Sequence, residues 1–469
     1  MKAIINRMAS FSLEEVLTTT AGRVLQGTGP VQFSRVGTDS RSVVAGELFV
    51  ALTGEHFDGH QFVPQALEDG ASGAVVSRTI SGKIPADKLL IQVGDTLQAL
   101  QRLSAYHRSQ FHIPLIAITG TAGKTTTKDL IAEVLKTKFN LLVTPGNMNN
   151  EFGVPLNLLS ITPEHQAVVI ELGMNHPGEV ALLTSLVAPN IGVATNVGAG
   201  HIGFFGSVEE IAREKSALFS ALPEEGYAIL NYDDPRVRSF PTRAHRVTYG
   251  LDWSAQIHPE KVVDKGLSGM EFSLGGVAFH LPLPGIFNLY NALAALAVGY
   301  SLGLSWSQMA PALAQAQGEP QRNDISEISG ITVVNSAYNA NPLSMESAIE
   351  WFSALPTKGH RLLLLGDMLE LGEKAEKAHQ ELGALVAKKW REGKIYALVA
   401  VGDLGMSITR SAWKAGMSRD LAIYEDREQA AKTLAQLLSA GDMLLVKASR
   451  KVRLEQLIEQ LSEQMSLKK

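Results

Sequence analysis

The stretch Ile118–Leu130, ITGTAGKTTTKDL, decides the fold of the central part of this chain. It overlaps the apolar run PLIAIT (114–119), which is typical of a buried strand. Apolar side chains then recur with helical spacing from Leu130 to Leu135, as in a helix that packs on a sheet. A strand, a glycine loop and a helix therefore follow one another in the order that a phosphate-binding loop requires.

The glycine loop is shorter than the usual nucleotide-binding pattern, which places four residues between its first glycine and its Gly-Lys pair. Here only Thr121 and Ala122 separate Gly120 from Gly123. A helix N-terminus still offers free N–H groups and the positive end of its dipole, so the loop can wrap a phosphate chain. The alternative is a glycine turn followed by a solvated lysine, but the flanking strand and helix favour phosphate binding. The predicted nucleotide-binding residues here are Gly120, Thr121, Ala122, Gly123, Lys124, Thr125 and Thr126, with Lys124 supplying positive charge and Thr125 a ligand for Mg²⁺.

Length and composition limit the possible classes of protein. A chain of 469 residues with 45% hydrophobic content exceeds one core, and a prior of ~150 residues per domain predicts about three domains. The formal charge of -5 leaves no broad basic face for nucleic acid, so we expect small-molecule partners. The absence of cysteine excludes disulfides, thiolate nucleophiles and cysteine metal sites, as is typical of a cytoplasmic protein.

The N-terminal sequence gives no sign of export. Glu14 and Glu15 come too early for a signal-peptide h-region, and no uninterrupted apolar run approaches ~18 residues. We therefore expect a cytoplasmic protein without a membrane span, and we expect it to be a monomer.

The order of apolar runs predicts an α/β protein of three domains. Residues 1–110 carry short strand-like runs and end in a helical pattern, which indicates a small α/β domain. Residues 111–317 alternate strand and helix candidates, which predicts a parallel sheet in an ATPase-like domain. Residues 318–469 repeat that alternation with runs such as RLLLLGD and DMLLVKAS, which predicts a second, Rossmann-like parallel sheet.

Two polar residues follow predicted strands of the central domain. Glu171 ends the apolar run AVVIEL, and His201 follows the next strand in NVGAGHIG. Ligands of open α/β sheets bind at the carboxyl ends of parallel strands, and a carboxylate there is a natural Mg²⁺ ligand. From the residues alone, a solvated glutamate and a hydrogen-bonded structural histidine remain open alternatives.

Lys215 occupies an unusual place for a lysine. Ser207 and Glu210 form an S-x-x-E capping box at the start of the helical segment VEEIAREKSALF. The apolar stripe of that helix, from Ile211 to Phe219, includes Lys215. A buried ammonium must reach water, find an anion or lose its charge. The simplest of these alternatives is that the Lys215 side chain extends along the protein surface until its ammonium reaches water.

Segments along nearly the whole chain together resemble the Mur ligase family of cell-wall synthesis, whose phosphate loop has this shorter form. They most resemble the members that add D-alanyl-D-alanine to a UDP-N-acetylmuramoyl-tripeptide. The segments are TDSRSVVAGELFVALTGEHFDGHQF, GTAGKTTTK, GNMNNEFGVPLNLL, VIELGMNHPGE, LPLPGIFNLYNALAA, NSAYNANPLSM, GDMLELGE and KASRKVRLE.

The resemblance implies a metal site and a modified lysine. Thr125, Glu171 and His201 correspond to ligands of two Mg²⁺ ions. The lysine of REKSALF, Lys215, is carbamylated by CO₂ in the family and becomes an anion that helps to order the metal site. Together with Lys124, these residues are the predicted catalytic set.

The resemblance also implies where the substrates bind. Clustered amides can hydrogen-bond sugar, phosphate or peptide groups, although turn formation is an alternative role for them. On the nucleotide side, Asn288, Asn291, Arg322 and Ser336 are expected to contact ATP. On the acceptor side, Ser40 and Arg41 of TDSR and the HFDGH segment are expected to belong to the uridine-binding first domain. The loop residues Asn147, Asn149 and Asn150 are expected to face the acceptor. The remaining expected contacts are Lys447, Ser449 and Arg450.

Three positions depart from the family pattern. Arg322 stands in PQR rather than Pro-Gly-Arg, and KASR replaces a glycine-containing version. Ser336 stands where the family usually has an aspartate that binds the nucleotide ribose. A hydroxyl is a weaker partner than a carboxylate, so nucleotide affinity is expected to be lower.

The expected activity is ATP-dependent ligation through an acyl phosphate, in the synthesis of the peptidoglycan precursor that cell shape and cell division require. Other ligases of this type, including ligases like folylpolyglutamate synthase, would share the loop, Glu171 and Lys215. The segments YNANP and DSR…FVAL favour the D-alanyl-D-alanine adder. A catalytically weak homologue that binds nucleotide as a regulator or scaffold is the alternative from another class, and Ser336 is the residue that suggests it.

Overall fold

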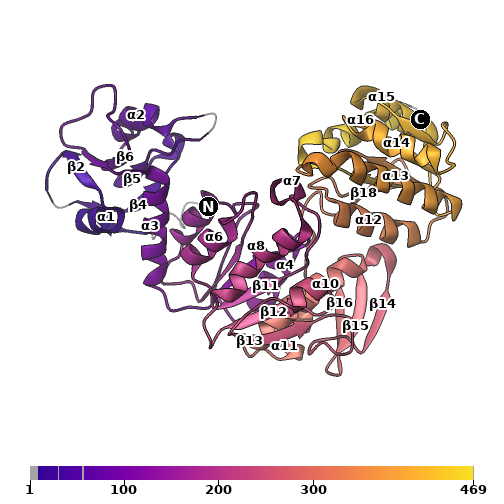
Figure 1. The fold of residues 1–469 in the computed structure, drawn as a ribbon, viewed down its shortest axis with the longest axis horizontal. Helices are drawn as coiled ribbons and strands as arrows, with labels where there is room; N and C mark the ends of the chain where they lie inside the picture. Colours follow the sequence, from indigo (N-terminus) through magenta and orange to yellow (C-terminus); the bar gives the residue numbers. More distant parts are fainter. Residues whose placement is uncertain (1–8, 30, 55–56, 468–469) are drawn as a thin grey trace.

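The structure is a computed structural model that describes residues 9–29, 31–54 and 57–467. Three α/β units follow one another along the chain, and the first and last lie at opposite ends of the molecule (Figure 1). This arrangement confirms the predicted fold class. The boundaries at 110/111 and 317/318 stay predictions. Most of the HFDGH segment is described, but His56 lies outside the described residues.

The first unit is built on a five-stranded sheet in the order β2-β7-β6-β5-β4, in which only the pairing of β2 with β7 is antiparallel. Its central strands are short apolar runs whose side chains are buried, so they form the core of the unit. Its elements are β1 (Phe11–Ser12), α1 (Leu13–Thr20), β2 (Arg23–Gln26), β3 (Gln32–Phe33), β4 (Arg35–Gly37), β5 (Glu47–Val50), α2 (Val63–Glu68), β6 (Gly73–Val76), β7 (Leu89–Gln92) and α3 (Thr96–Ser109), with 3-10 turns η1 (Ser40–Ser42) and η2 (Gly59–Phe62).

The central unit holds a six-stranded, fully parallel sheet in the order β13-β12-β11-β8-β10-β9. Its strands are β8 (Leu115–Thr119), β9 (Leu141–Val143), β10 (Ala167–Glu171), β11 (Ile191–Ala194), β12 (Tyr227–Asn231) and β13 (His245–Tyr249). Strand β8 lies between β10 and β11, so the chain order reverses beside it. In open α/β sheets such a switch point, at the carboxyl ends of the strands, is where ligands bind.

Helices cover both faces of this sheet, and a small antiparallel sheet extends the unit beside them (Figure 1). The helices are α4 (Lys124–Leu135), α5 (Gly153–Leu158), α6 (Glu179–Val187), α7 (Ile202–Phe205), α8 (Val208–Ser220), α9 (Pro235–Arg238), α10 (Ile286–Ser301) and α11 (Trp306–Leu313). The small sheet comprises β14 (Lys261–Asp264), β15 (Met270–Leu274) and β16 (Val277–Leu281), with η3 (Gly266–Ser268). Helix α10 is buried along almost its whole length because nearly every side chain in it is small or apolar.

The capping box predicted for α8 forms only in part. The Ser207 side chain accepts a hydrogen bond from the backbone N–H of Glu210, as expected. The Glu210 carboxylate instead accepts hydrogen bonds from Arg213, one turn along the helix, at 2.5 and 2.6 Å. A charged partner on the exposed helix surface thus replaces the backbone N–H as the donor to this carboxylate.

The last unit contains a six-stranded sheet in the order β17-β18-β22-β19-β20-β21, parallel except for the edge strand β17. Its strands are β17 (Asp324–Ile328), β18 (Ile331–Asn335), β19 (Arg361–Leu365), β20 (Ala397–Ala400), β21 (Ala422–Tyr424) and β22 (Met443–Lys447). Its helices are α12 (Pro342–Ala354), α13 (Ala375–Arg391), α14 (Gly405–Lys414), α15 (Arg427–Leu437) and α16 (Leu454–Leu467), with η4 (Gly372–Lys374) and η5 (Arg450–Val452).

Candidate active site

The predicted phosphate loop leads from β8 into α4. Gly123 has a φ of 82° and serves as the N-cap of α4, which begins at Lys124 and has no side-chain cap. An L side chain rarely adopts this backbone conformation, and a Cβ at Gly123 would also collide with the Asn291 side chain. Because no side chain caps the helix, its first N–H groups are available to a phosphate.

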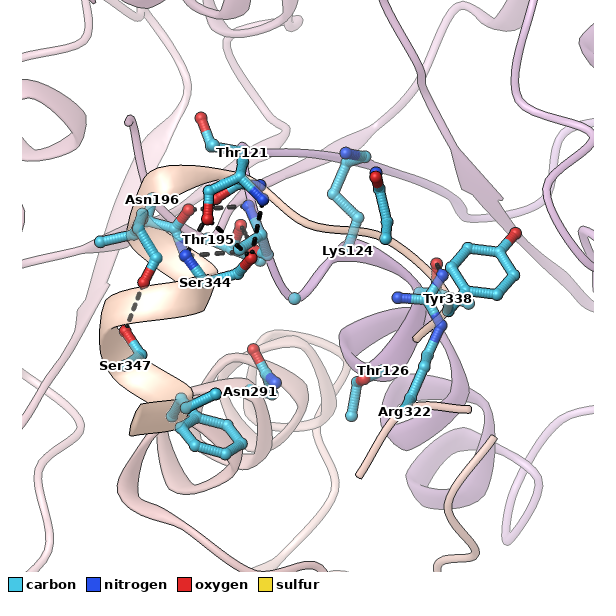
Figure 2. A pocket seen from close by; sticks show the side chains of 18 of the residues that line it. Thr121, Lys124, Thr126, Thr195, Asn196, Asn291, Arg322, Tyr338, Ser344 and Ser347 are labelled. Atoms are coloured by element: carbon cyan, nitrogen blue, oxygen red, sulfur yellow. Dashed lines mark hydrogen bonds between the residues drawn. The ribbon is translucent and has the colours of Figure 1, made fainter. Parts of the chain in front are cut away.

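Residues after β11 hold the loop in place. The Asn196 side chain accepts a hydrogen bond from the Ala122 N–H at 2.9 Å and donates one to the Ala122 carbonyl at 3.1 Å. The Thr195 hydroxyl donates to the same carbonyl at 2.7 Å, and the Thr121 hydroxyl accepts from the Gly198 N–H at 2.9 Å. Figure 2 shows Thr121, Thr195 and Asn196 gathered at this side of the pocket. The loop is therefore held in its shape before any ligand arrives.

The loop faces a cavity of about 910 Å³ that the central and last units line together. Most residues predicted from the sequence line this cavity, although they come from segments far apart in the chain. They are Thr121, Ala122, Gly123, Lys124, Thr125, Thr126, Asn147, Asn149, Asn150, Glu171, His201, Asn288, Asn291, Arg322, Ser336 and Lys447.

Two lysine side chains meet at Gly120, next to the cavity. The Lys124 and Lys215 ammonium groups each donate a hydrogen bond to the Gly120 carbonyl oxygen at 3.0 Å. Lys215 is 2% exposed, so it does not reach water, and its second neighbour is the Met174 sulfur at 3.5 Å. Burial, together with the nearby Lys124 charge, lowers the pKa of Lys215 well below its ordinary value. Burial also lowers the pKa of Lys124.

Thr125 and Glu171 form a polar centre at the carboxyl ends of β8 and β10. The Thr125 hydroxyl donates to one Glu171 carboxylate oxygen at 2.8 Å, and the Asn149 side chain donates to the other at 2.8 Å. Arg322 of the last unit donates to the Thr125 hydroxyl at 2.9 Å. Its guanidinium lies 3.9 Å from the centre of the Tyr338 ring. Figure 2 shows these two side chains next to each other. Glu171 is 3% exposed. The alternative that it is a solvated glutamate at a strand end is therefore wrong.

His201 lines the same cavity but is engaged by the last unit. Its Nδ1 lies 2.7 Å from a carboxylate oxygen of Glu370, and this contact lowers the Glu370 pKa. The Gly203 N–H also donates to the Glu370 carbonyl at 3.0 Å. Lys374 donates to the Gly206 carbonyl at 2.5 Å. These contacts fasten α7 to the turn before α13 and so join the central and last units beside the cavity.

The predicted asparagines differ in what they contact. Asn291 accepts a hydrogen bond from Thr127 of α4 at 3.2 Å and donates one to Asn288 at 3.2 Å, so these two residues also brace α4 against α10. Asn150 accepts from the Gly153 N–H at 2.9 Å and so stabilises the start of α5. Turn formation, which was the alternative role considered for the clustered asparagines, is therefore part of the role of Asn150.

Lys447 is buried at the end of β22, where its hydrogen-bond partners are neutral and the positive charge of Arg322 is nearby. Its ammonium donates to the Ser336 hydroxyl at 3.1 Å and to the Asn339 carbonyl at 3.2 Å. Burial lowers the pKa of Lys447 to about 7.

Gly120, Lys215, Ser449 and Arg450 stand beside the cavity rather than among the residues lining it. The Ser449 hydroxyl accepts from the Leu369 N–H at 3.0 Å and therefore supports the loop that carries Glu370. Arg450 lies 5.2 Å from the centre of the Tyr338 ring.

Ser40 and Arg41 do not join the cavity. They lie in η1 of the first unit, where Asp39 accepts hydrogen bonds from Arg41 at 2.8 Å. These bonds lower the pKa of Asp39 to about 2. A substrate that reached both the uridine site and the phosphate loop would therefore have to extend between two units.

Three residues of the site are missing from the sequence predictions. Asn196 shapes the phosphate loop, Tyr338 supports two arginines and Glu370 engages His201. Asn196 lies two residues after the end of β11, so its place near the carboxyl end of a strand was a usable signal. Glu370 lies in GDMLELGE, but nothing in that segment alone points to a histidine of another unit.

Three family models match successive parts of the chain. The Mur ligase family catalytic domain matches residues 32–108, the Mur ligase middle domain matches residues 118–299, and the Mur ligase glutamate ligase domain matches residues 322–450. The chain belongs to the Mur ligase family. The three units of this Mur ligase thus correspond to three domains of the family.

Individual relatives are similar over almost the full length. The UDP-N-acetylmuramoyl-tripeptide–D-alanyl-D-alanine ligase of Bacillus subtilis is 35% identical, with 91% of this chain and 93% of the relative covered. A crystal structure of MurF from Acinetobacter baumannii superposes with a TM-score of 0.88 at 30% identity, covering 97% of this chain and 100% of that one. The structure of MurF from Thermotoga maritima in complex with ADP superposes with a TM-score of 0.82 at 27% identity, covering all of both chains. Across the described part of this Mur ligase, no helix has the length and apolar character needed to cross a membrane.

Replacing Ser336 with aspartate tests whether this residue contacts the ribose of ATP, as predicted from the sequence. Ser336→Asp is expected to lower the KM for ATP about fivefold, since a charge-assisted hydrogen bond exceeds a neutral one by about 1 kcal/mol. The new carboxylate also raises the Lys447 pKa above about 7, because the ammonium is only 3.1 Å from the Ser336 hydroxyl. Lys447 is charged below its pKa, so in Ser336→Asp it should keep its charge to a higher pH than in the wild-type protein.

Steady-state kinetics over a pH series measure this effect, with Ser336→Ala as the matched control that removes the hydroxyl. The turnover number of Ser336→Asp should barely change. An ATP KM that is the same in all three proteins would place the ribose elsewhere.

Proposed function

We propose that this Mur ligase joins D-alanyl-D-alanine to a UDP-N-acetylmuramoyl-tripeptide with hydrolysis of ATP to ADP and phosphate, in peptidoglycan precursor synthesis. The supporting observation is the single cavity in which the phosphate loop, Glu171 and the cationic groups Arg322 and Lys447 meet. The relatives that match this chain over nearly its full length carry the name of this activity.

The reaction forms an amide in two steps. The terminal carboxylate of the tripeptide attacks the γ-phosphorus of ATP, which gives an acyl phosphate and ADP. The amine of D-alanyl-D-alanine then attacks the acyl carbon, phosphate leaves, and the amine loses a proton. Water would hydrolyse the acyl phosphate, so a cavity closed by the last unit protects this intermediate.

Residues of this chain supply binding and charge for the first step. The free N–H groups at the start of α4 bind the phosphate chain. Lys124 and Arg322 face the transferring phosphoryl group, and phosphoryl transfer requires that its charge be stabilised. Asn196 and Thr195 keep the loop in position, and Glu370 holds His201 at the edge of the cavity.

The donor atoms at Thr125 and Glu171 fit Mg²⁺. A hydroxyl and a carboxylate 2.8 Å apart are hard oxygen ligands, which Mg²⁺ prefers together with phosphate oxygens. When bound, Mg²⁺ would neutralise charge on the phosphates. His201, which lines the same cavity, is proposed as a ligand of a second ion, and the metal would compete with Glu370 for its Nδ1.

We also propose that Lys215 is carbamylated. Two lysine ammonium groups donate to one carbonyl oxygen, and each disfavours the charge of the other. The lowered pKa of Lys215 favours its neutral amine, which is the form that reacts with CO₂. The reaction adds CO₂ to the amine and releases one proton, leaving a carbamate anion. The anion would attract Lys124 instead of repelling it, and it would face the same centre as Glu171.

The proposal also assigns residues that bind the acceptor. Asn147, Asn149 and Asn150 are proposed to bind the UDP-linked acceptor near the cavity. Ser40 and Arg41 are proposed to contact its uridine end in the first unit. Because ATP and a UDP-linked precursor are its substrates, we propose the cytoplasm as its compartment.

Measuring phosphate release with separate substrates tests the proposal. Release should require ATP, a UDP-N-acetylmuramoyl-tripeptide and D-alanyl-D-alanine together, and acceptors with lysine or diaminopimelate at position three should be compared. Release with D-glutamate or another amino acid in place of the dipeptide would instead assign a different ligase of this family. Nucleotide binding without release under any combination would assign a regulatory or scaffolding homologue.

A further inference from the structure

The second turn of α4 contains a buried lysine that phosphate binding does not explain. Lys128 is 2% exposed, and its ammonium donates to the carbonyls of Thr144 at 2.9 Å and Gly146 at 3.5 Å. Asp129 lies 3.2 Å away. Burying an ammonium is costly unless its hydrogen bonds are satisfied, so a lysine here needs a reason beyond filling space.

The two carbonyls that accept hydrogen bonds from Lys128 lie at the start of the loop between β9 and α5. Gly146 has a φ of 53°, so the chain turns sharply there, and the loop continues through Asn147 to Asn150. At its far end, Asn149 is fixed on Glu171 and its carbonyl accepts from the Gly173 N–H at 2.7 Å. Lys128 therefore helps to hold the near end of a loop whose far end is held on the proposed metal ligand.

At this end Thr144 is also bonded to β10, because its N–H and its hydroxyl donate to the Val169 carbonyl at 3.0 and 3.3 Å. Beyond Thr144, Lys128 supports the loop through the Gly146 carbonyl. Strand β9 is a three-residue edge strand whose side chains are only partly buried. An edge strand of this length defines the position of the following residues weakly. A charge-assisted bond from a helix that is packed in the core supplies a firmer support. The same helix begins with Lys124 and Thr125, so it positions the phosphate loop and the asparagine loop together.

We propose that Lys128 is a positioning residue for the UDP-linked acceptor, acting through the Thr144–Asn150 loop. This inference rests on the proposed function, because it takes the asparagines of that loop as acceptor contacts. Lys128 does not face the cavity and is not expected to touch ATP or the reacting atoms.

Lys128→Met keeps the length and most of the apolar volume of the side chain but removes the charge. The KM for UDP-N-acetylmuramoyl-tripeptide should rise about tenfold, while the KM for ATP and the turnover number stay within about twofold. Hydrogen exchange of the amides from Gly146 to Asn150 should accelerate about tenfold in the absence of any ligand. This second measurement does not depend on activity.

Asp129→Asn is the matched control, because it removes the neighbouring carboxylate and leaves both carbonyl bonds intact. It should leave the acceptor KM and loop exchange unchanged. If Lys128→Met does not fold, as shown by circular dichroism, Lys128→Gln gives the same test with a polar side chain too short to reach both carbonyls.

Equal changes in the acceptor and ATP KM values, or loop exchange at the wild-type rate, would overturn the proposal. An effect of Asp129→Asn as large as that of Lys128→Met would overturn it as well, since the ion pair would then be the cause. A wild-type protein that does not ligate would contradict the proposed function instead, and the exchange measurement would still decide the role of Lys128.

Discussion

Lys215→Arg is expected to lower the ligation rate about a thousandfold, the upper range for losing one stabilising group at a reacting centre. Arginine keeps a positive charge in the buried position but cannot form the carbamate in the same way as lysine. The repulsion with Lys124 would therefore persist, and the anion beside Glu171 would be lost. Lys215→Ala should be nearly inactive because it also lacks the anion beside Glu171.

Bicarbonate and pH provide the decisive measurement for Lys215. Only the neutral amine takes up CO₂, so mildly alkaline pH and bicarbonate favour the carbamate, and enzyme stripped of CO₂ at low pH should lose activity. Activity should return when bicarbonate is added. Small carboxylates that fit the vacated space should partly rescue Lys215→Ala, whereas Lys215→Arg should resist rescue.

The opposite results are equally specific. Full activity of Lys215→Arg would exclude a carbamate in the reaction. An intact-mass and crystallographic examination of active enzyme at neutral pH that found only an unmodified amine would have the same consequence. Lys215 would then be a buried lysine held by the Gly120 carbonyl and nothing more.

Lys124→Ala is expected to reduce turnover about a hundredfold, which corresponds to ~3 kcal/mol of lost transition-state stabilisation. The change removes the positive charge that we propose faces the phosphates of ATP. The fold should persist, because the backbone of the loop is held by Asn196 and Thr195 rather than by the lysine side chain.

Single-turnover phosphate release measures this effect, and circular dichroism with thermal unfolding checks the fold. Thr126→Ala is a suitable comparison in the same helical turn, since it removes a lining hydroxyl but no charge. Near-normal turnover in a folded Lys124→Ala protein would remove the basis for the phosphate-loop assignment.

The amino-acid sequence by itself determined the parts of this protein that depend on neighbouring residues. The apolar run before Gly120 and the helical spacing after Lys124 specified the strand, loop and helix that the structure contains. The apolar stripe of α8 likewise placed Lys215 on the face that packs in the core, but it left open whether the ammonium reaches water. Hydrophobic periodicity and glycine positions are local properties, so the chain carries them without reference to its fold.

Tertiary structure alone decided how distant segments share one cavity. His201 meets Glu370, and Asn196 reaches back to Ala122, only because β11 lies beside β8 and the last unit packs over α7. The half-formed capping box of α8 was decided in the same way, by an arginine that competes for Glu210. Lys128 finds its two carbonyl partners only because the loop after β9 lies against α4. Such contacts depend on strand order and on which groups compete for one partner, and neither is encoded in a local pattern.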